Sequence, residues 1–262
     1  MASTSTAEHP VRSAAELETM REAGRVVALA LQAVKAAAVP GVKLRDLDDI
    51  ARTALHEAGA ESSFFGYAPA WAPTPYKGVL CLSPNEVVVH GPPTGRKVAD
   101  GDVLSIDFGA AVDGWHGDAA ITVIAGTSTE EDRRLVAATE EALAAGIAAA
   151  VPGATLLDVA TAIDAVAKKH GFAHLPDHGG HGIGRAMHEA PFVPNQPLAW
   201  SQDVRLEAGH TIAIEPMLLA GSPEYRTARD GWSVVTRDRR RAAHVEHTVA
   251  VTDDGPVVLT AP

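Results

Sequence analysis

The chain has 262 residues, of which 46% are hydrophobic, and a formal net charge of -11. A chain of this length and composition can bury a substantial core, so we expect a globular α+β protein rather than a disordered one. The acidic balance argues against general nucleic-acid binding, DNA included, because such proteins need a basic surface to neutralise phosphates. The one cysteine, Cys81, cannot form an internal disulfide, which suits a reducing cytoplasm.

The first residues show no targeting pattern. Residues 1–12 contain no positive region followed by an apolar run, so they do not resemble a secretory signal, and we expect a flexible segment there. The longest apolar tracts are rich in alanine and are interrupted within the length that a membrane span needs. We therefore expect a cytoplasmic protein without membrane insertion, whose single domain covers residues 13–262.

Two helices are predicted near the N-terminus. Ser13 and Glu16 have the spacing of a capping box, and apolar residues recur at helical intervals as far as about Ala38. Glycine and proline then separate this helix from a second one over residues 44–58. Residues 61–78 are rich in aromatic residues and proline, which predicts an irregular loop that forms the wall of a pocket.

A hairpin follows. The apolar runs Val103–Phe108 and Ala119–Ile124 are predicted strands, and a Val-Asp-Gly turn lies between them. Asp107 and Asp118 each stand in otherwise uncharged strand sequence. Because an unpaired buried carboxylate is costly, the two together suggest a cation between the strands. The alternative is that both are ordinary turn or edge residues.

The second half of the chain repeats the first. The hexapeptide AAAVPG at residues 36–41 recurs at residues 148–153, and two pairs of strands also match. These pairs are Gly101–Asp107 with Gly209–Glu215, and Asp118–Val123 with Glu246–Val251. In the first pair a carboxylate ends each apolar strand. We infer two similar α+β halves that each contribute two carboxylates to a site at their junction.

A glycine-rich segment breaks this symmetry. Residues 177–188 carry His178, His181 and His188 where glycine lets the backbone approach closely. The segment is either a ligand-bearing element or a flexible loop that binds metal weakly. Four carboxylates with one histidine suit a pair of divalent ions such as Mn²⁺, Fe²⁺, Co²⁺ or Zn²⁺. Structural salt bridges are the competing interpretation.

Six short motifs occur in order along the chain: His90–Pro93, Asp107, His116–Asp118, Gly180–Gly184, Ile214–Met217 and Glu246–Thr248. Together they resemble the type I methionine aminopeptidases, which have the pita-bread metallopeptidase fold. The resemblance covers residues 15–260, and the short intervals between the later motifs exclude the large insertion of type II. It implies two pseudo-symmetric halves with an antiparallel sheet and flanking helices.

The resemblance also implies roles for individual residues. Asp118 and Glu246 would bridge two metal ions, and Glu215 would also transfer the proton of the attacking water. His90 would lie near the scissile amide, and His188 would contact the peptide and stabilise the intermediate. The implied metal ligands are Asp107, Asp118, His181, Glu215 and Glu246.

A methionine pocket is implied as well. Besides His90 and His188, its expected residues are Tyr76, Cys81, Met187 and Trp232. Met187 stands where a phenylalanine is frequent in related enzymes, and methionine is soft enough to contact a thioether. The segment from Tyr67 to Pro75 is longer and richer in proline than in those relatives.

The implied activity is hydrolysis of the N-terminal methionine from nascent proteins and peptides with a small second residue. It would use two divalent ions (Co, Mn, Fe or Zn) and a metal-activated bridging water. The basic run Arg237–Arg241 is either a solvated hairpin loop or, as in the family, a ribosome contact. A monomer is implied.

Two alternatives use the same fold. Aminopeptidase P and prolidase share the five ligands but usually carry an additional N-terminal domain. A non-catalytic pita-bread binding protein would generally lack several ligands, all of which this sequence holds.

Overall fold

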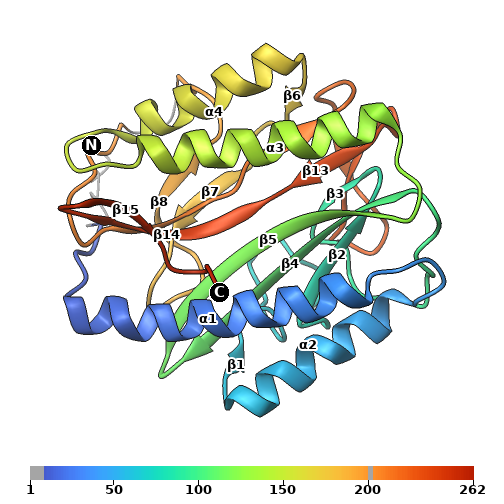
Figure 1. Cartoon of the computed structure of the whole chain (residues 1–262), viewed down its shortest axis with the longest axis horizontal. Helices are drawn as coiled ribbons and strands as arrows, with labels where there is room; N and C mark the ends of the chain where they lie inside the picture. The colour runs from blue at the N-terminus through green and yellow to red at the C-terminus, as the bar shows by residue number, and fades with distance from the viewer. Residues whose placement is uncertain (1–8, 200–202) are drawn as a thin grey trace.

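In the computed structural model, residues 9–199 and 203–262 are described. Two helix pairs flank a central antiparallel sheet, one pair on each side of it in the view of Figure 1. The first pair is α1 (Ala14–Ala37) with α2 (Leu44–Ala58), and the second is α3 (Glu130–Ala149) with α4 (Leu156–His170).

The central sheet joins the two halves of the chain. Its main path runs β1-β4-β5-β14-β9-β7-β8, with β2 beside β4 and β15 beside β14. The strands of the first half are β1 (Glu61–Ser62), β2 (Leu80–Pro84), β4 (Asp102–Val112) and β5 (Trp115–Ala125). Those of the second half are β7 (Gly179–Gly182), β8 (Glu189–Pro194), β9 (Thr211–Ile214), β14 (Glu246–Thr252) and β15 (Gly255–Val258).

Two small sheets complete the described structure. One contains β13 (Ala242–His244), β10 (Met217–Leu219) and β6 (Ala173–His174). The other contains β11 (Tyr225–Thr227), β12 (Val234–Thr236) and β3 (Val87–Val89). Separate apolar cores lie under the two helix pairs, one around Leu47 and Phe108 and the other around Leu135 and Ile163. The expected α+β halves are therefore confirmed.

The first two helices have the predicted boundaries because their ends are set by local interactions. Ser13 Oγ accepts a hydrogen bond from the Glu16 amide, and the Glu16 carboxylate accepts one from the Ser13 amide. Helix α2 ends at Gly59, whose φ of +62° is accessible to glycine at little cost. Gly171, its counterpart in the internal repeat, ends α4 in the same conformation with φ +73°.

The β4–β5 hairpin is longer than predicted, and one expectation was wrong. The carboxylate of Asp107 does not end its strand, because pairing with β5 continues to Val112 opposite Trp115. Glu215 does directly follow the end of β9. Residues 61–78 are irregular except for β1, which pairs with β4.

The basic run Arg237–Arg241 is not a hairpin loop, which corrects that expectation. It connects β12 to β13, and these strands lie in different sheets. The reason is that β12 pairs with β11 and β3, whereas β13 pairs with β10.

Of the N-terminal segment, residues 1–8 lie outside the described residues. Arg12 donates its amide hydrogen to Gly209 O at 2.8 Å, and its guanidinium forms an ion pair with Glu189. The rings of His9 and His210 lie 3.7 Å apart between centroids. Within the described part of the chain, no helix is long and apolar enough to cross a membrane.

Asp48 ties α2 to the strand that leads into the pocket. Its side chain is buried, with 4% exposure, and Oδ1 accepts hydrogen bonds from the Val79 and Leu80 amides at 2.7 and 2.9 Å. Asp48→Ala leaves two buried N–H groups without acceptors and should reduce the free energy of unfolding by about 3 kcal/mol. Urea unfolding would measure this. The exposed neighbour provides the control, since Asp49→Ala should change stability by less than about 0.5 kcal/mol. Equal effects of the two variants would contradict the assignment.

Candidate metal centre

Five adjacent strands of the central sheet each deliver one of the predicted ligands. In the order of the sheet these are Asp107 on β4, Asp118 on β5, Glu246 on β14, Glu215 after β9 and His181 on β7. Asp107 pairs with Ala120 and Asp118 with Gly109, so the two aspartates lie diagonally on one face of the hairpin. The structure therefore brings all five predicted ligands to one region.

The internal repeat explains this arrangement. The two halves meet where β14 pairs with β5, with Glu246 opposite Ala120. Asp118 and Glu246 are equivalent in the repeat and occupy the two strands of this junction. Asp107 and Glu215, also equivalent, lie one strand further out on each side. The pseudo-symmetry thus places two carboxylates at the centre and one on each flank.

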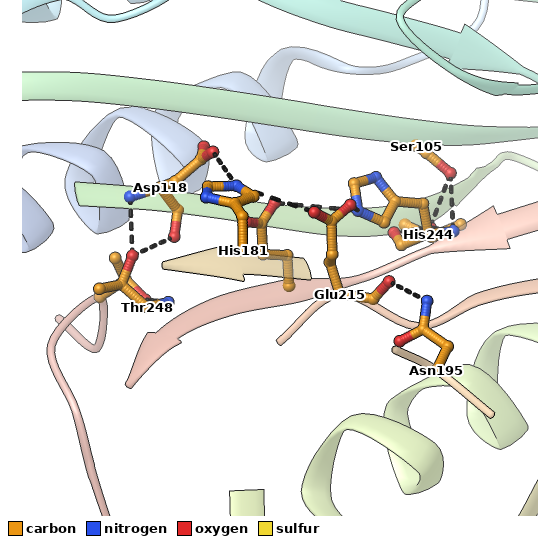
Figure 2. Close-up of polar contacts among 10 residues, drawn as sticks. Ser105, Asp118, His181, Asn195, Glu215, His244 and Thr248 are labelled. Carbon is orange, nitrogen blue, oxygen red and sulfur yellow. Dashed lines mark hydrogen bonds and ion pairs between the residues drawn. The ribbon is translucent and has the colours of Figure 1, made fainter. Parts of the chain in front are cut away.

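Histidines connect the carboxylates in the centre of the site (Figure 2). His181 Nε2 lies 4.0 Å from Asp118 Oδ2 and 3.8 Å from Glu215 Oε1. His244 Nε2 lies 3.4 Å from Glu215 Oε2 and 3.8 Å from Glu246 Oε2. Two groups could each hold a metal ion, and Glu246 belongs to both. They are Asp118 with His181 and Glu246, and Glu215 with His244 and Glu246.

The buried carboxylates of the site repel one another, and a cation would offset this repulsion. Burial, and then the charges of neighbouring carboxylates, raise the pKa of Asp107, Asp118 and Glu246 well above the ordinary range. One oxygen of each is buried without a hydrogen-bond partner among the described residues. Such oxygens are hard ligands, and a divalent ion would offset the repulsion between them. The residues present therefore fit a divalent metal.

Surrounding groups orient the ligands. His181 Nδ1 lies 2.9 Å from Gly182 O, so a proton held there is donated to the carbonyl and leaves the Nε2 lone pair toward the carboxylates. Thr248 Oγ1 accepts from the Asp118 amide at 2.9 Å and donates to Asp118 O at 2.8 Å. Asn195 Nδ2 donates to Glu215 O at 2.9 Å. Figure 2 shows the contacts of Thr248 with Asp118 and of Asn195 with Glu215.

His244 belongs to the site but was not predicted from the sequence. Its side chain is only 2% exposed, and its amide lies 3.1 Å from both Ser105 Oγ and Thr122 Oγ1 on the β4–β5 hairpin. The sequence does contain one indication of this position. His244 precedes Glu246 by two residues, and in an extended chain the side chains of such residues point to the same face. His244 also affects Glu215. Burial raises the pKa of Glu215, but His244, His181 and His188 together lower it below its ordinary value.

His90 and His188 approach the cluster from two loops. The ring of His188 lies 4.2 Å from that of His181 and 5.2 Å from that of Tyr67, measured between centroids. Burial, and then His181, lower the pKa of His188 to about 3. His90 has φ +61°, a strained conformation for this residue type that is common at functional sites. Burial, and then His178, lower the pKa of His90 to about 4, so both imidazoles are neutral at pH 7.

The five predicted ligands, His90 and His188 line one cavity of about 450 Å³. Beside the five predicted ligands and the two histidines, it is lined by the four predicted pocket residues Tyr76, Cys81, Met187 and Trp232. The loop 61–78, which was predicted to form the wall of a pocket, contributes Phe64, Tyr67 and Trp71 to the lining. His178, Phe192 and Met217 also line the cavity and were not predicted as site residues.

The antiparallel sheet has two similar halves, and carboxylates and an imidazole from both halves meet in one cavity at their junction. This combination of fold and site is that of a metallopeptidase of the pita-bread class. The model of Metallopeptidase family M24 matches residues 18–253, and the chain belongs to this family. It is accordingly a hydrolase that binds divalent metal.

Known relatives agree with this assignment. Methionine aminopeptidase 1 of Mycobacterium tuberculosis is 50% identical over 96% of this chain and 94% of its own, and methionine aminopeptidase of Aquifex aeolicus is 47% identical over 94% and 96%. The crystal structure of methionine aminopeptidase from Thermotoga maritima has a TM-score of 0.92 at 38% identity, covering 97% of this chain and all of the other. Prolidase from Pyrococcus furiosus, at 21% identity and a TM-score of 0.78, shares the fold. The expected pita-bread fold and the resemblance to methionine aminopeptidases are confirmed.

Proposed function

We propose that the protein removes the N-terminal methionine from nascent proteins and peptides with a small second residue, and that it does so in the cytoplasm as a monomer. The main support for this proposal is that the candidate metal ligands, which are rich in oxygen, and a set of apolar side chains line the same cavity. Relatives at 40–50% identity over nearly the whole chain bear the name methionine aminopeptidase. Sedimentation equilibrium would check the monomer.

We infer two ions, with Co, Mn, Fe and Zn as the candidates for a mixed carboxylate and imidazole site. Asp107, Asp118, His181, Glu215 and Glu246 would hold them. The central position of Asp118 and Glu246 at the junction of the halves supports a bridging role for these two. Ions held by these residues would lower the pKa of a bound water and would stabilise the negative charge that develops in amide hydrolysis.

The side chains of this site would move the proton and orient the peptide. Glu215, held ionised by its histidine neighbours, is available to take a proton from water and to return it to the leaving amine. The neutral imidazoles of His90 and His188 would donate hydrogen bonds to the scissile amide and to the oxygen on which charge develops. Both rings line the cavity beside the predicted ligands, and stacking on Trp71 and Tyr67 orients them there.

The apolar part of the cavity suits a methionine side chain. Phe64, Tyr76 and Trp232 pack in one cluster with Cys81 and Met187. These surfaces accept a flexible thioether. His188 stacks on Tyr67 and His90 stacks on Trp71, so large rings stand beside the ligands, where they would crowd the second residue of a substrate. We infer that this crowding selects small second residues.

Peptide hydrolysis by metal-stripped protein reloaded with Co²⁺ or Mn²⁺ tests the proposal. Release of methionine from Met-Gly but not from Met-Lys is expected. Preferential cleavage of Xaa-Pro peptides would instead indicate an aminopeptidase P or prolidase activity. If no peptide were cleaved in a metal-dependent way, a binding protein would be favoured.

We also propose that the basic run Arg237–Arg241 contacts the ribosome, and the ion pairs within the protein favour two of its arginines for this role. Arg240 forms an ion pair with Glu131, and Arg241 lies 2.6 Å from Asp132 at the start of α3. These acidic partners neutralise half of the run, so Arg237 and Arg239 are the better candidates for rRNA phosphates.

The double variant Arg237→Glu/Arg239→Glu should therefore weaken co-sedimentation with ribosomes and reduce the slope of log K against log salt by about 1 to 2. Arg21→Glu/Arg25→Glu on the exposed face of α1 gives the same change in net charge and should have little effect. Equal losses in the two double variants would argue against a specific contact.

A further inference from the structure

Trp71 is exposed to solvent and also lines the cavity of the site. Its side chain is 59% exposed, yet it lines the same cavity as the metal ligands, so it lies at the cavity mouth. Its ring stacks on that of His90 with centroids 6.0 Å apart, and it meets the Trp232 ring edge-on at 5.1 Å. A large aromatic side chain left open at the rim of a site is a candidate contact for ligand.

The loop that carries Trp71 is held in place. The Tyr76 amide donates to Tyr67 O at 2.9 Å, which closes the base of the loop. At its far side, Trp232 Nε1 donates to Thr74 O at 3.2 Å. Pro73 packs so closely against Gly231 that a Cβ there would lie 2.3 Å from the proline ring. A fixed aromatic side chain loses little conformational entropy on binding, which favours its use in recognition.

The path of the substrate leads past this residue. When the first residue of a peptide lies beside the metal ligands, the rest of the chain leaves through the mouth, and Trp71 forms part of that rim. We propose that Trp71 provides a subsite for peptide residues beyond the scissile bond, with preference for an aromatic or long aliphatic side chain at the third position. This inference rests on the proposed function.

Kinetics with three substrates test it. The unchanged enzyme should have a higher kcat/KM for Met-Ala-Phe-Ala than for Met-Ala-Ser-Ala. In Trp71→Ala the ratio of these two values should fall about three- to tenfold, because this factor corresponds to the interaction energy of one aromatic pair. Trp71→Phe, which keeps a ring, should retain most of the preference. Met-Ala serves as the reference, because a loss of support for His90 would lower hydrolysis of all three substrates alike and leave the ratio unchanged.

The outcomes are distinct. An unchanged ratio in Trp71→Ala, in protein with normal metal content and thermal stability, would overturn the subsite while leaving methionine removal intact. Failure of the unchanged enzyme to cleave Met-Ala and both tetrapeptides would overturn the proposed function and the subsite together.

Discussion

Asp118→Asn is expected to lower methionine release at least about 10³-fold and to abolish most of the stabilisation that divalent metal gives the protein. The fold reduction corresponds to about 4 kcal/mol of transition-state stabilisation, within what a catalytic metal supplies. The reason lies in the position of Asp118, between Asp107 on the neighbouring strand and Glu246 across the junction of the halves.

The same substitution should stabilise the metal-free protein. Burial and Glu215 raise the pKa of Asp118 well above the ordinary range, so the ionised cluster destabilises the folded state at pH 7. Removing one carboxylate relieves that repulsion. We expect a gain of about 1 kcal/mol, or about 2–4 °C in Tm, when unfolding is followed in EDTA. In Mn²⁺ the order should reverse, because metal at 100 times its Kd stabilises the unchanged protein by about 2.7 kcal/mol.

Asp102 offers a matched control in the same hairpin. It is also buried, but Arg96 Nη1 donates to Oδ2 at 2.7 Å, Asn85 Nδ2 to Oδ1 at 2.7 Å and the Ala99 amide to Oδ2 at 2.8 Å. Burial raises the pKa of Asp102, yet these donors lower it below its ordinary value. Asp102→Asn should therefore lower Tm with and without metal and leave the Mn²⁺ shift unchanged. If Asp118→Asn behaved in the same way, the idea of a repulsive cluster would be wrong.

The elements that the sequence predicted well are those fixed by neighbours in the chain. Ser13 and Glu16 cap α1 within one turn, and Gly59 ends α2 through its own conformation. The hairpin holding Asp107 and Asp118 needs only a two-residue turn. The predicted hairpin was too short because the strand residues between Phe108 and Asp118 include several glycines and alanines, which have a low propensity for strands.

Other features depend on contacts between distant segments and could not be predicted locally. His244 faces Glu215 because Ser105 and Thr122, more than 100 residues away, fix its backbone. The strand order β4-β5-β14-β9-β7 brings the two halves edge to edge. In the sequence, only the internal repeat indicated that the halves meet in this way. Trp71 reaches His90 through a loop whose shape is set by Trp232. Aromatic composition indicated a pocket wall there but not which ring would lie at the mouth.

His188→Ala tests the chemistry apart from metal binding, and we expect a loss of about 10²- to 10³-fold in kcat with metal content unchanged. A hydrogen-bond donor held in the cavity and aimed at developing charge contributes on this scale. His188 lies against His181 but is not among the predicted ligands, and its low pKa makes it a neutral donor. His188→Gln, which keeps an N–H donor, should recover part of the activity.

His178 provides the comparison for this variant because it lines the same cavity. Its Nδ1 lies 2.8 Å from Pro176 O, and its ring meets Tyr225 edge-on. His178→Ala should cost less than about tenfold in kcat, since its hydrogen bond serves the local backbone. Measured kcat, KM and bound metal for both variants separate the possibilities. Loss of metal from His188→Ala would mean that this ring supports His181, and its role would then be positioning rather than stabilisation of charge on the substrate.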